Sequence, residues 1–197
     1  VEAFDIRDAS IKRFSNAECE FDYRESIFKT KEFGNYIVTS VLFRLNLTPH
    51  FNIDYKDVKE YLSGCSNITL STIREAIIAI RKKKLPDPSE IGNAGSFFKN
   101  PIVDFEKAKE LKTQFPDIIQ YELPNGQIKL AAGWLIDKAG WKGYKCGDAG
   151  VHHVQALVLV NYGEACGNEI ITLAADIEDS VMNTFGVKIS PEVRIVK

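Results

Sequence analysis

The sequence has 197 residues, with 25 Lys or Arg and 27 Asp or Glu, so its formal net charge at pH 7 is −2. A hydrophobic content of 45% and an aromatic content of 11% exclude a disordered chain, and no run of about 18 apolar residues predicts a membrane-spanning helix. The balanced charge argues against binding to duplex nucleic acid, because proteins of that class carry a basic excess.

The N-terminal part of the chain predicts a small sheet. Residues 1–6 (VEAFDI) and 10–15 (SIKRFS) read as two extended runs joined by three residues, which is typical of a hairpin. Because the sequence opens inside this sheet and with Val1 instead of Met, we expect it to be part of a longer polypeptide. Residues 36–46 (YIVTSVLFRLN) are rich in β-branched and aromatic residues, which predicts a well-buried strand.

A helix is expected after a segment without regular apolar spacing. Residues 47–68 show no sustained period, apart from a possible short turn near 57–62, and we place a domain boundary near 64–69. The isoleucines that follow repeat at i, i+4 and i+7, and either Thr69 or Thr72 could cap this helix at its N-terminus. A basic run at 81–84 suits the end of a helix, and a Leu-Pro pair then stops it.

The second half of the chain alternates short helices and strands. Residues 86–101 lack periodicity and are expected to form a long irregular, functional segment. After it the patterns predict a helix at 105–115, a hairpin at 120–130, a helix at 131–140, a buried strand at 154–160, a long helix at 168–185 ending at Gly186, and extended segments at 187–190 and 193–196. This mixed order predicts an α+β fold.

The cysteines and histidines do not form a recognisable metal or disulfide pattern. There is no CxxC pair and no ligand-like spacing to a histidine, so we expect buried free thiols in a reducing cytosol and no metal site. The adjacent His152 and His153 lie beside a predicted strand and are expected to be packed and hydrogen-bonded.

The segment 92–101 (GNAGSFFKNP) carries the strongest chemical signal. Its two glycines, three apart, let the backbone approach a ligand closely, and the Ser96 hydroxyl that follows can give or take a proton. Its spacing matches neither a P-loop nor a dinucleotide fingerprint. The structural alternative is a tight turn in which Ser96 caps a helix.

Three charged residues have both a bland and a functional interpretation. Lys84 could be a solvated helix end or an ammonium for phosphate oxygens, and Arg24 could form a surface ion pair or bind a carboxylate. Glu192 could be an exposed edge charge or a catalytic carboxylate. From the residues alone the chain is an α+β protein with a loop suited to anions.

Six segments together resemble the UDP-N-acetylenolpyruvoylglucosamine reductase (MurB) family. They are YRESIFK (23–29), KLPDP (84–88), GNAGSFFKNP (92–101), KLAAGWLID (129–137), QALVLVN (155–161) and PEVRIV (191–196). They follow the family order with compatible spacing, and a tyrosine-bearing insertion around residue 55 resembles the longer subclass. The resemblance implies that 1–68 is the C-terminal part of a FAD-binding domain that lacks its upstream portion, 69–185 a substrate-binding domain, and 186–197 a tail returning to the flavin lobe.

The resemblance also implies roles for individual residues. Ser96 would donate the proton to an enolate-like intermediate, Arg24 would polarise the substrate carboxylate, and Glu192 would be the acidic partner there. Contacts to the substrate diphosphate would come from Tyr55, Lys84, Asn100 and Gln155. The segment around Tyr55 matches the family only loosely, and Tyr61 is nearby, so either tyrosine could make the contact.

The implied activity is reduction of UDP-N-acetylglucosamine enolpyruvate to UDP-N-acetylmuramate, with NADPH as co-substrate and FAD as cofactor, in cytoplasmic peptidoglycan precursor synthesis. One alternative is a catalytically silent fragment that only binds a UDP-sugar. Another is an unrelated hydrolase built on Ser96, which a serine-directed reagent would label. The implied partners are the UDP-sugar, without nucleic acid or membrane, and no oligomeric state is predicted.

Overall fold

A computed structural model describes residues 1–32 and 34–196, and the chain divides into two compact units, Val1–Phe51 and Asn52–Lys197. Helices combine with several small antiparallel sheets, which confirms the predicted α+β class. Among the described residues, no helix has the length and apolar character needed to cross a membrane.

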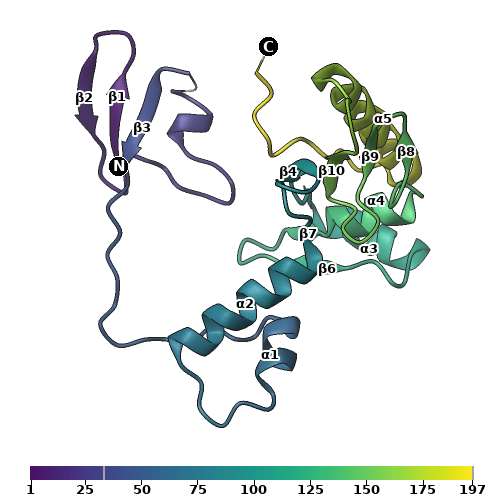
Figure 1. Cartoon of the computed structure of the whole chain (residues 1–197), viewed down its shortest axis with the longest axis horizontal. Coiled ribbons are helices and arrows are strands. Elements are labelled where there is room, and N and C mark those ends of the chain that lie inside the picture. Colours follow the sequence, from purple (N-terminus) through teal and green to yellow (C-terminus); the bar gives the residue numbers. More distant parts are fainter. Residues whose placement is uncertain (33, 197) are drawn as a thin grey trace. The chain divides into compact units, whose positions relative to one another are not determined.

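In chain order the elements are β1 (Glu2–Asp5), β2 (Ser10–Arg13), the 3-10 helix η1 (Ile27–Lys29), β3 (Tyr36–Ser40), α1 (Lys56–Leu62), α2 (Leu70–Lys84), β4 (Gly92–Ser96), β5 (Ile102–Val103), α3 (Phe105–Gln114), β6 (Gln120–Glu122), β7 (Ile128–Leu130), α4 (Ala132–Lys138), β8 (Lys145–Cys146), β9 (Ala149–Val151), β10 (Val158–Asn161) and α5 (Gly167–Phe185) (Figure 1).

The first unit contains a three-stranded antiparallel sheet with the order β2-β1-β3, and the predicted N-terminal hairpin is confirmed as β1 and β2. Asp5, at the end of the central strand, has a side chain that is only 1% exposed. Its carboxylate accepts hydrogen bonds from Arg7 Nε at 2.9 Å and Lys12 Nζ at 2.7 Å. The hydrogen bonds from Arg7, and next those from Lys12, hold the pKa of Asp5 well below its usual range.

The prediction of a well-buried strand over 36–46 is wrong in its extent and its burial. The strand β3 ends at Ser40, and four of its five residues are exposed. Beyond it, Leu42 is 96% exposed and Leu45 81%. Strand propensity reflects a fit to a pleated, half-buried surface, and it cannot supply the neighbouring element that does the burying.

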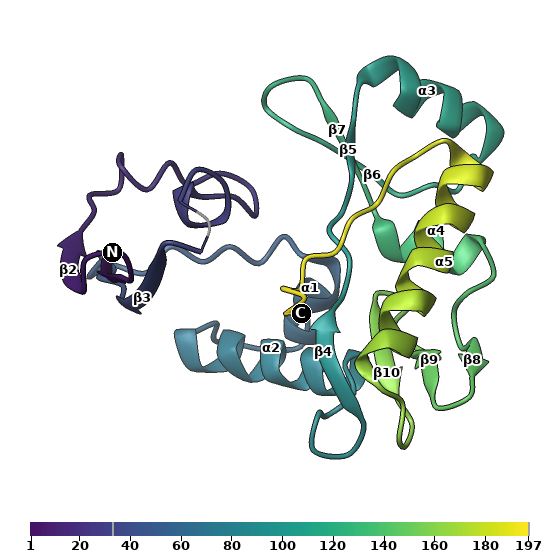
Figure 2. The ribbon, with the colours of Figure 1, turned by 90° about the horizontal axis from the view of Figure 1, so that it is seen from above.

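The second unit is built around a four-stranded antiparallel sheet with the order β4-β10-β9-β8. The long helix α5 packs on β9 and β10 and also contacts α4 (Figure 2). A smaller antiparallel sheet, β5-β7-β6, contains the predicted hairpin, and α3 contacts β7. These elements enclose one large hydrophobic core.

Helix α5 follows the sequence prediction closely. Leu173, Ile177 and Val181 are spaced four residues apart and all are buried, so one face of the helix lies on the core. Gly186 ends the helix with φ 62°, a left-handed conformation that glycine adopts without steric cost. At α2 the capping residue is Thr69, whose side chain accepts a hydrogen bond from the Thr72 N–H.

Tertiary pairing changes the prediction for residues 86–101, since the segment expected to be irregular contains β4. At the C-terminus, Pro191, which lies between the two expected extended segments, forms an isolated bridge with Phe98. The glycines and the serine of β4 have little strand propensity of their own. Pairing with β10 supplies the hydrogen bonds that make this segment a strand.

The second unit begins at Asn52, ahead of the boundary expected near 64–69. The reason is that α1 packs on α2 and shares a small core with it, formed by Val58, Leu62 and Ala76. The assignment of 1–68, 69–185 and 186–197 to flavin and substrate lobes stays a prediction, and Lys197 lies outside the described residues.

The expectation of buried thiols is wrong for three of the four cysteines. Only Cys19 is buried, whereas Cys65, Cys146 and Cys166 are exposed free thiols. Cys146 lies in the outer strand β8 and Cys166 caps the start of α5, so both sit at edges of the fold where neighbouring elements leave the side chain accessible.

The buried Asp5 carboxylate makes the first unit sensitive to acid. Because its folded-state pKa is depressed, the stabilisation is fully present above about pH 4 and is lost as pH falls further, when the unfolded chain binds the proton first. Asp5→Asn is therefore expected to destabilise the unit at pH 7 and to flatten its acid transition. Circular dichroism between pH 7 and pH 2 measures this. Glu20→Gln, which removes an exposed ion pair with Lys31, is the matched control and should leave the transition in place.

Candidate active site

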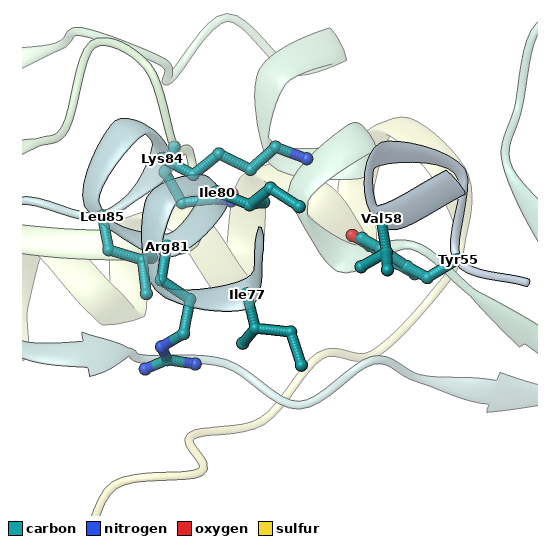
Figure 3. A pocket seen from close by; sticks show the side chains of 8 residues that line it. Tyr55, Val58, Ile77, Ile80, Arg81, Lys84 and Leu85 are labelled. Atoms are coloured by element: carbon teal, nitrogen blue, oxygen red, sulfur yellow. The ribbon is translucent and has the colours of Figure 1, made fainter. Parts of the chain in front are cut away.

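A cavity of about 270 Å³ lies where α1 meets the C-terminal end of α2. Its lining combines apolar side chains with a tyrosine, a glutamine and two cations, so it could hold a ring together with a charged group. Its lining residues are Tyr55, Val58, Ile77, Ile80, Arg81, Lys84, Leu85 and Gln155 (Figure 3).

Lys84 is the last residue of α2, and its side chain lines this cavity. Its side chain extends from the end of α2 toward α1 (Figure 3), where the ammonium forms an ion pair with Asp57 and lies 5.7 Å from the centre of the Tyr55 ring. The hydrogen bond to Asp57 raises the pKa of Lys84. The ammonium therefore stays charged, and the ion pair and the ring fix its position before any ligand binds.

Of the two tyrosines considered from the sequence, Tyr55 lines the cavity and Tyr61 does not belong to its lining. Two residues at or beside the cavity were not predicted. Asp57 is the partner of Lys84, and Arg81 brings a second cation one turn earlier on α2. The i, i+3 spacing of Arg81 and Lys84 could have indicated that both lie on one helix face.

Gln155 reaches the same cavity from the loop between β9 and β10. Its side-chain Oε1 accepts a hydrogen bond from the Leu157 N–H at 3.4 Å. Asn100 lies on the segment after β4, and its Oδ1 accepts from the Ala132 N–H at 2.9 Å, at the start of α4. The Asn100 side-chain oxygen therefore fixes the start of a helix.

Ser96 is the last residue of β4 and is exposed, so it does not cap a helix. It pairs with Val158 of β10, and a register shift in this pairing coincides with Gly95, whose φ of 73° suits glycine. An extra residue in one strand re-aims the side chains beyond it. The bulge thus determines the direction of the Ser96 side chain.

Glu192 is brought next to this serine by the C-terminal segment. The Glu192 N–H donates to the Phe97 carbonyl at 2.7 Å, and the Lys99 N–H donates to the Ser190 carbonyl at 2.9 Å. Glu192 is half-buried, which differs from the exposed edge charge considered as its non-functional interpretation. Two candidates nearly 100 positions apart in sequence thus lie on adjoining backbone.

Arg24 is the one candidate in the first unit, whereas the other six lie in the second. It is exposed, its guanidinium lies 5.8 Å from the centre of the Tyr23 ring, and its backbone has φ 58°. A non-glycine residue in the left-handed region is uncommon and is found preferentially at functional sites.

The adjacent histidines behave as expected in part. His152 is 7% exposed and its Nδ1 accepts from the Gln155 N–H, while His153 is exposed. Within residues 1–32 and 34–196 no cluster of three or more potential metal ligands occurs.

Comparison with known proteins matches residues 87–196 to the family described as UDP-N-acetylenolpyruvoylglucosamine reductase, C-terminal domain. The chain belongs to this family. Residues 87–196 include Ser96, Asn100, Gln155 and Glu192, so most of the candidate site lies within the region that the MurB family shares.

Curated MurB relatives extend the similarity across the whole chain. A UDP-N-acetylenolpyruvoylglucosamine reductase of Pseudomonas putida is 46% identical over 192 residues, covering 96% of this chain and 56% of the relative. Proteins of the same name from Flavobacterium johnsoniae and Amoebophilus asiaticus are 46% and 47% identical, and the chain covers 58% and 59% of them. The chain thus spans a little over half the length of these relatives.

The Lys84–Asp57 pair is expected to position charge more than to stabilise the fold. Both side chains are about one-third exposed, so the pair is screened by solvent and should contribute at most about 1 kcal/mol to the free energy of unfolding. A double-mutant cycle with Asp57→Asn and Lys84→Met, measured by urea denaturation, gives the coupling energy. A coupling above about 3 kcal/mol, as for a buried pair, would contradict this interpretation.

Proposed function

We propose that this chain supplies the substrate-binding and proton-donating parts of UDP-N-acetylenolpyruvoylglucosamine reduction. The observation that carries the proposal is the pairing of β4 with β10, in a chain of this family. Through it, Ser96 of β4 is held beside the end of the Gln155-bearing loop, which leads into β10. The reaction converts the enolpyruvyl ether of the UDP-sugar into a lactyl ether, as the names of the full-length relatives imply.

The cavity between α1 and α2 is suited to the nucleotide diphosphate end of this substrate. Lys84 offers a charge-assisted hydrogen bond to a phosphate oxygen, which can take the place of the Asp57 carboxylate. The Tyr55 ring and the apolar floor give a surface for a planar base, and Gln155 adds an amide. Asn100 does not line this cavity, and by the family resemblance its Nδ2 amide would also contact the diphosphate.

The reacting end would meet Ser96, Glu192 and Arg24. When a hydride adds to the terminal vinyl carbon, negative charge develops on the carboxylate side of the substrate. Arg24 would stabilise that charge through its guanidinium, and Glu192 would share a proton with the carboxylate, so that both act electrostatically. The Ser96 hydroxyl would then donate a proton to the carbon next to the carboxylate, acting as the general acid.

The open backbone around Gly95 is compatible with a flavin beside Ser96. A Cβ built on Gly95 would meet no atom within 4 Å, so a planar ring can approach there. Bound FAD, reduced by NADPH, would supply the hydride. We assign no residue of this chain to the flavin or to its pyrophosphate.

A second candidate function is a UDP-sugar-binding module without reductase activity of its own. It is favoured by the location of the cavity within the second unit alone. Flavin absorbance of the purified chain distinguishes the two functions, because the module would be colourless and still bind UDP. Either function fits a bacterial cytoplasmic pathway of peptidoglycan precursors.

Ser96→Ala is expected to lower substrate reduction about 10²- to 10⁴-fold, because a positioned general acid contributes about that much. The measurement is stopped-flow kinetics in a full-length reductase that carries this chain as its C-terminal part. Flavin reduction by NADPH should stay at the wild-type rate, which serves as the internal control. Unchanged substrate reduction would contradict the proposed role, and covalent labelling of Ser96 by a serine-directed reagent would favour a hydrolase instead.

Lys84→Met is expected to weaken UDP binding to this chain about 10- to 100-fold, the usual range for losing a charged hydrogen bond. Isothermal titration calorimetry with UDP measures the dissociation constant. Lys83→Met removes the neighbouring charge of the same basic run and is the matched control, since Lys83 does not line the cavity. Equal losses in the two variants would show that only the net charge of the helix end matters.

A further inference from the structure

The loop between β9 and β10 is closed by a histidine side chain. At its base the His152 N–H donates to the Val158 carbonyl at 2.9 Å, and the Val158 N–H donates to the Gln155 carbonyl at 3.0 Å. Inside the loop, His152 Nδ1 accepts from the Gln155 N–H at 3.2 Å. The imidazole therefore satisfies the backbone donor of Gln155, a residue that lines the cavity.

This contact requires one protonation state of His152. A ring nitrogen can accept a hydrogen bond only when it carries no proton, so the geometry implies the neutral tautomer with hydrogen on Nε2. Burial, and next the neighbouring His153, lower the pKa of His152 and so favour the neutral ring. With only 7% of the residue exposed, water is a poor substitute for the lost acceptor.

The side-chain amide of Gln155 makes further contacts of its own. Gln155 Oε1 accepts from the Leu157 N–H and lies 3.4 Å from the position of a Cβ built on Gly133, so α4 confines the amide from the other side. The same loop also reaches the reacting end, because the Leu157 carbonyl accepts from the Phe97 N–H at 2.7 Å.

We propose that His152 is a positioning residue, which acts through its Nδ1 acceptor to hold Gln155 in the conformation that contacts the nucleotide end of the substrate. This inference rests on the proposed function of the cavity, and it assigns to His152 no contact with the substrate. It predicts that UDP binding depends on the hydrogen-bond acceptor at position 152 more than on the aromatic ring there.

The test compares three variants of the 197-residue chain by calorimetric titration with UDP. His152→Phe keeps a ring without an acceptor and is expected to weaken UDP binding about 5-fold, the effect of one neutral hydrogen bond. His152→Asn places Oδ1 where Nδ1 lies and is expected to restore binding to within about 2-fold of wild type. His153→Phe makes the same change at the exposed neighbour and is expected to bind as wild type.

The outcomes separate this inference from the proposed function. Absence of UDP binding by the wild-type chain would refute the function proposed for the cavity. Wild-type binding together with equal binding by His152→Phe, or with equal loss in His152→Asn and His152→Phe, would overturn the positioning role alone. A purely structural role would lower the melting temperature of His152→Phe and leave its dissociation constant unchanged.

A measurement on the wild-type chain keeps the test decisive if His152→Phe fails to fold. Long-range ¹H–¹⁵N correlation spectra at pH 7 distinguish the two neutral tautomers of a histidine. We expect His152 to show a protonated Nε2 and an unprotonated Nδ1. A protonated Nδ1 would overturn the proposal, because that nitrogen could not accept from Gln155.

Discussion

The pairing between β4 and β10 is the constraint on which the rest of the site depends. Backbone hydrogen bonds join Ser96 and Phe97 to the segment 157–158, and Phe97 in turn accepts from Glu192. Each of these bonds links stretches that are far apart in sequence, so the site has little local stability of its own. The site forms because burial of the large core under this sheet offsets the conformational entropy lost when three distant segments become ordered.

Charge at the cavity is organised in advance of binding. Lys84 keeps its proton and its position because Asp57 accepts its hydrogen bond and the Tyr55 ring lies beside it. Under the proposed function, an arriving phosphate would exchange one anionic partner of Lys84 for another, so this cation is paired before and after binding. The same arrangement lowers the net gain on binding, since the Asp57 pair must be broken first.

The two units differ in how completely their apolar side chains are buried. The second unit encloses a large core, whereas the first leaves apolar side chains after β3 exposed and satisfies one buried carboxylate, Asp5, with two cations. Arg24 belongs to this first unit, and the role proposed for it at the substrate carboxylate comes from the family resemblance.

The sequence by itself determined the elements whose signals are local. The period of α5, the Gly186 end of that helix and the N-terminal hairpin follow from side-chain spacing and turn chemistry, and motif order alone identified the family. Only the tertiary structure decided that 92–96 forms a strand, that Asp57 pairs with Lys84, and that His152 supports Gln155. These contacts join residues whose own propensities do not reveal a partner, so their geometry emerges only when the core fixes the distant segments together.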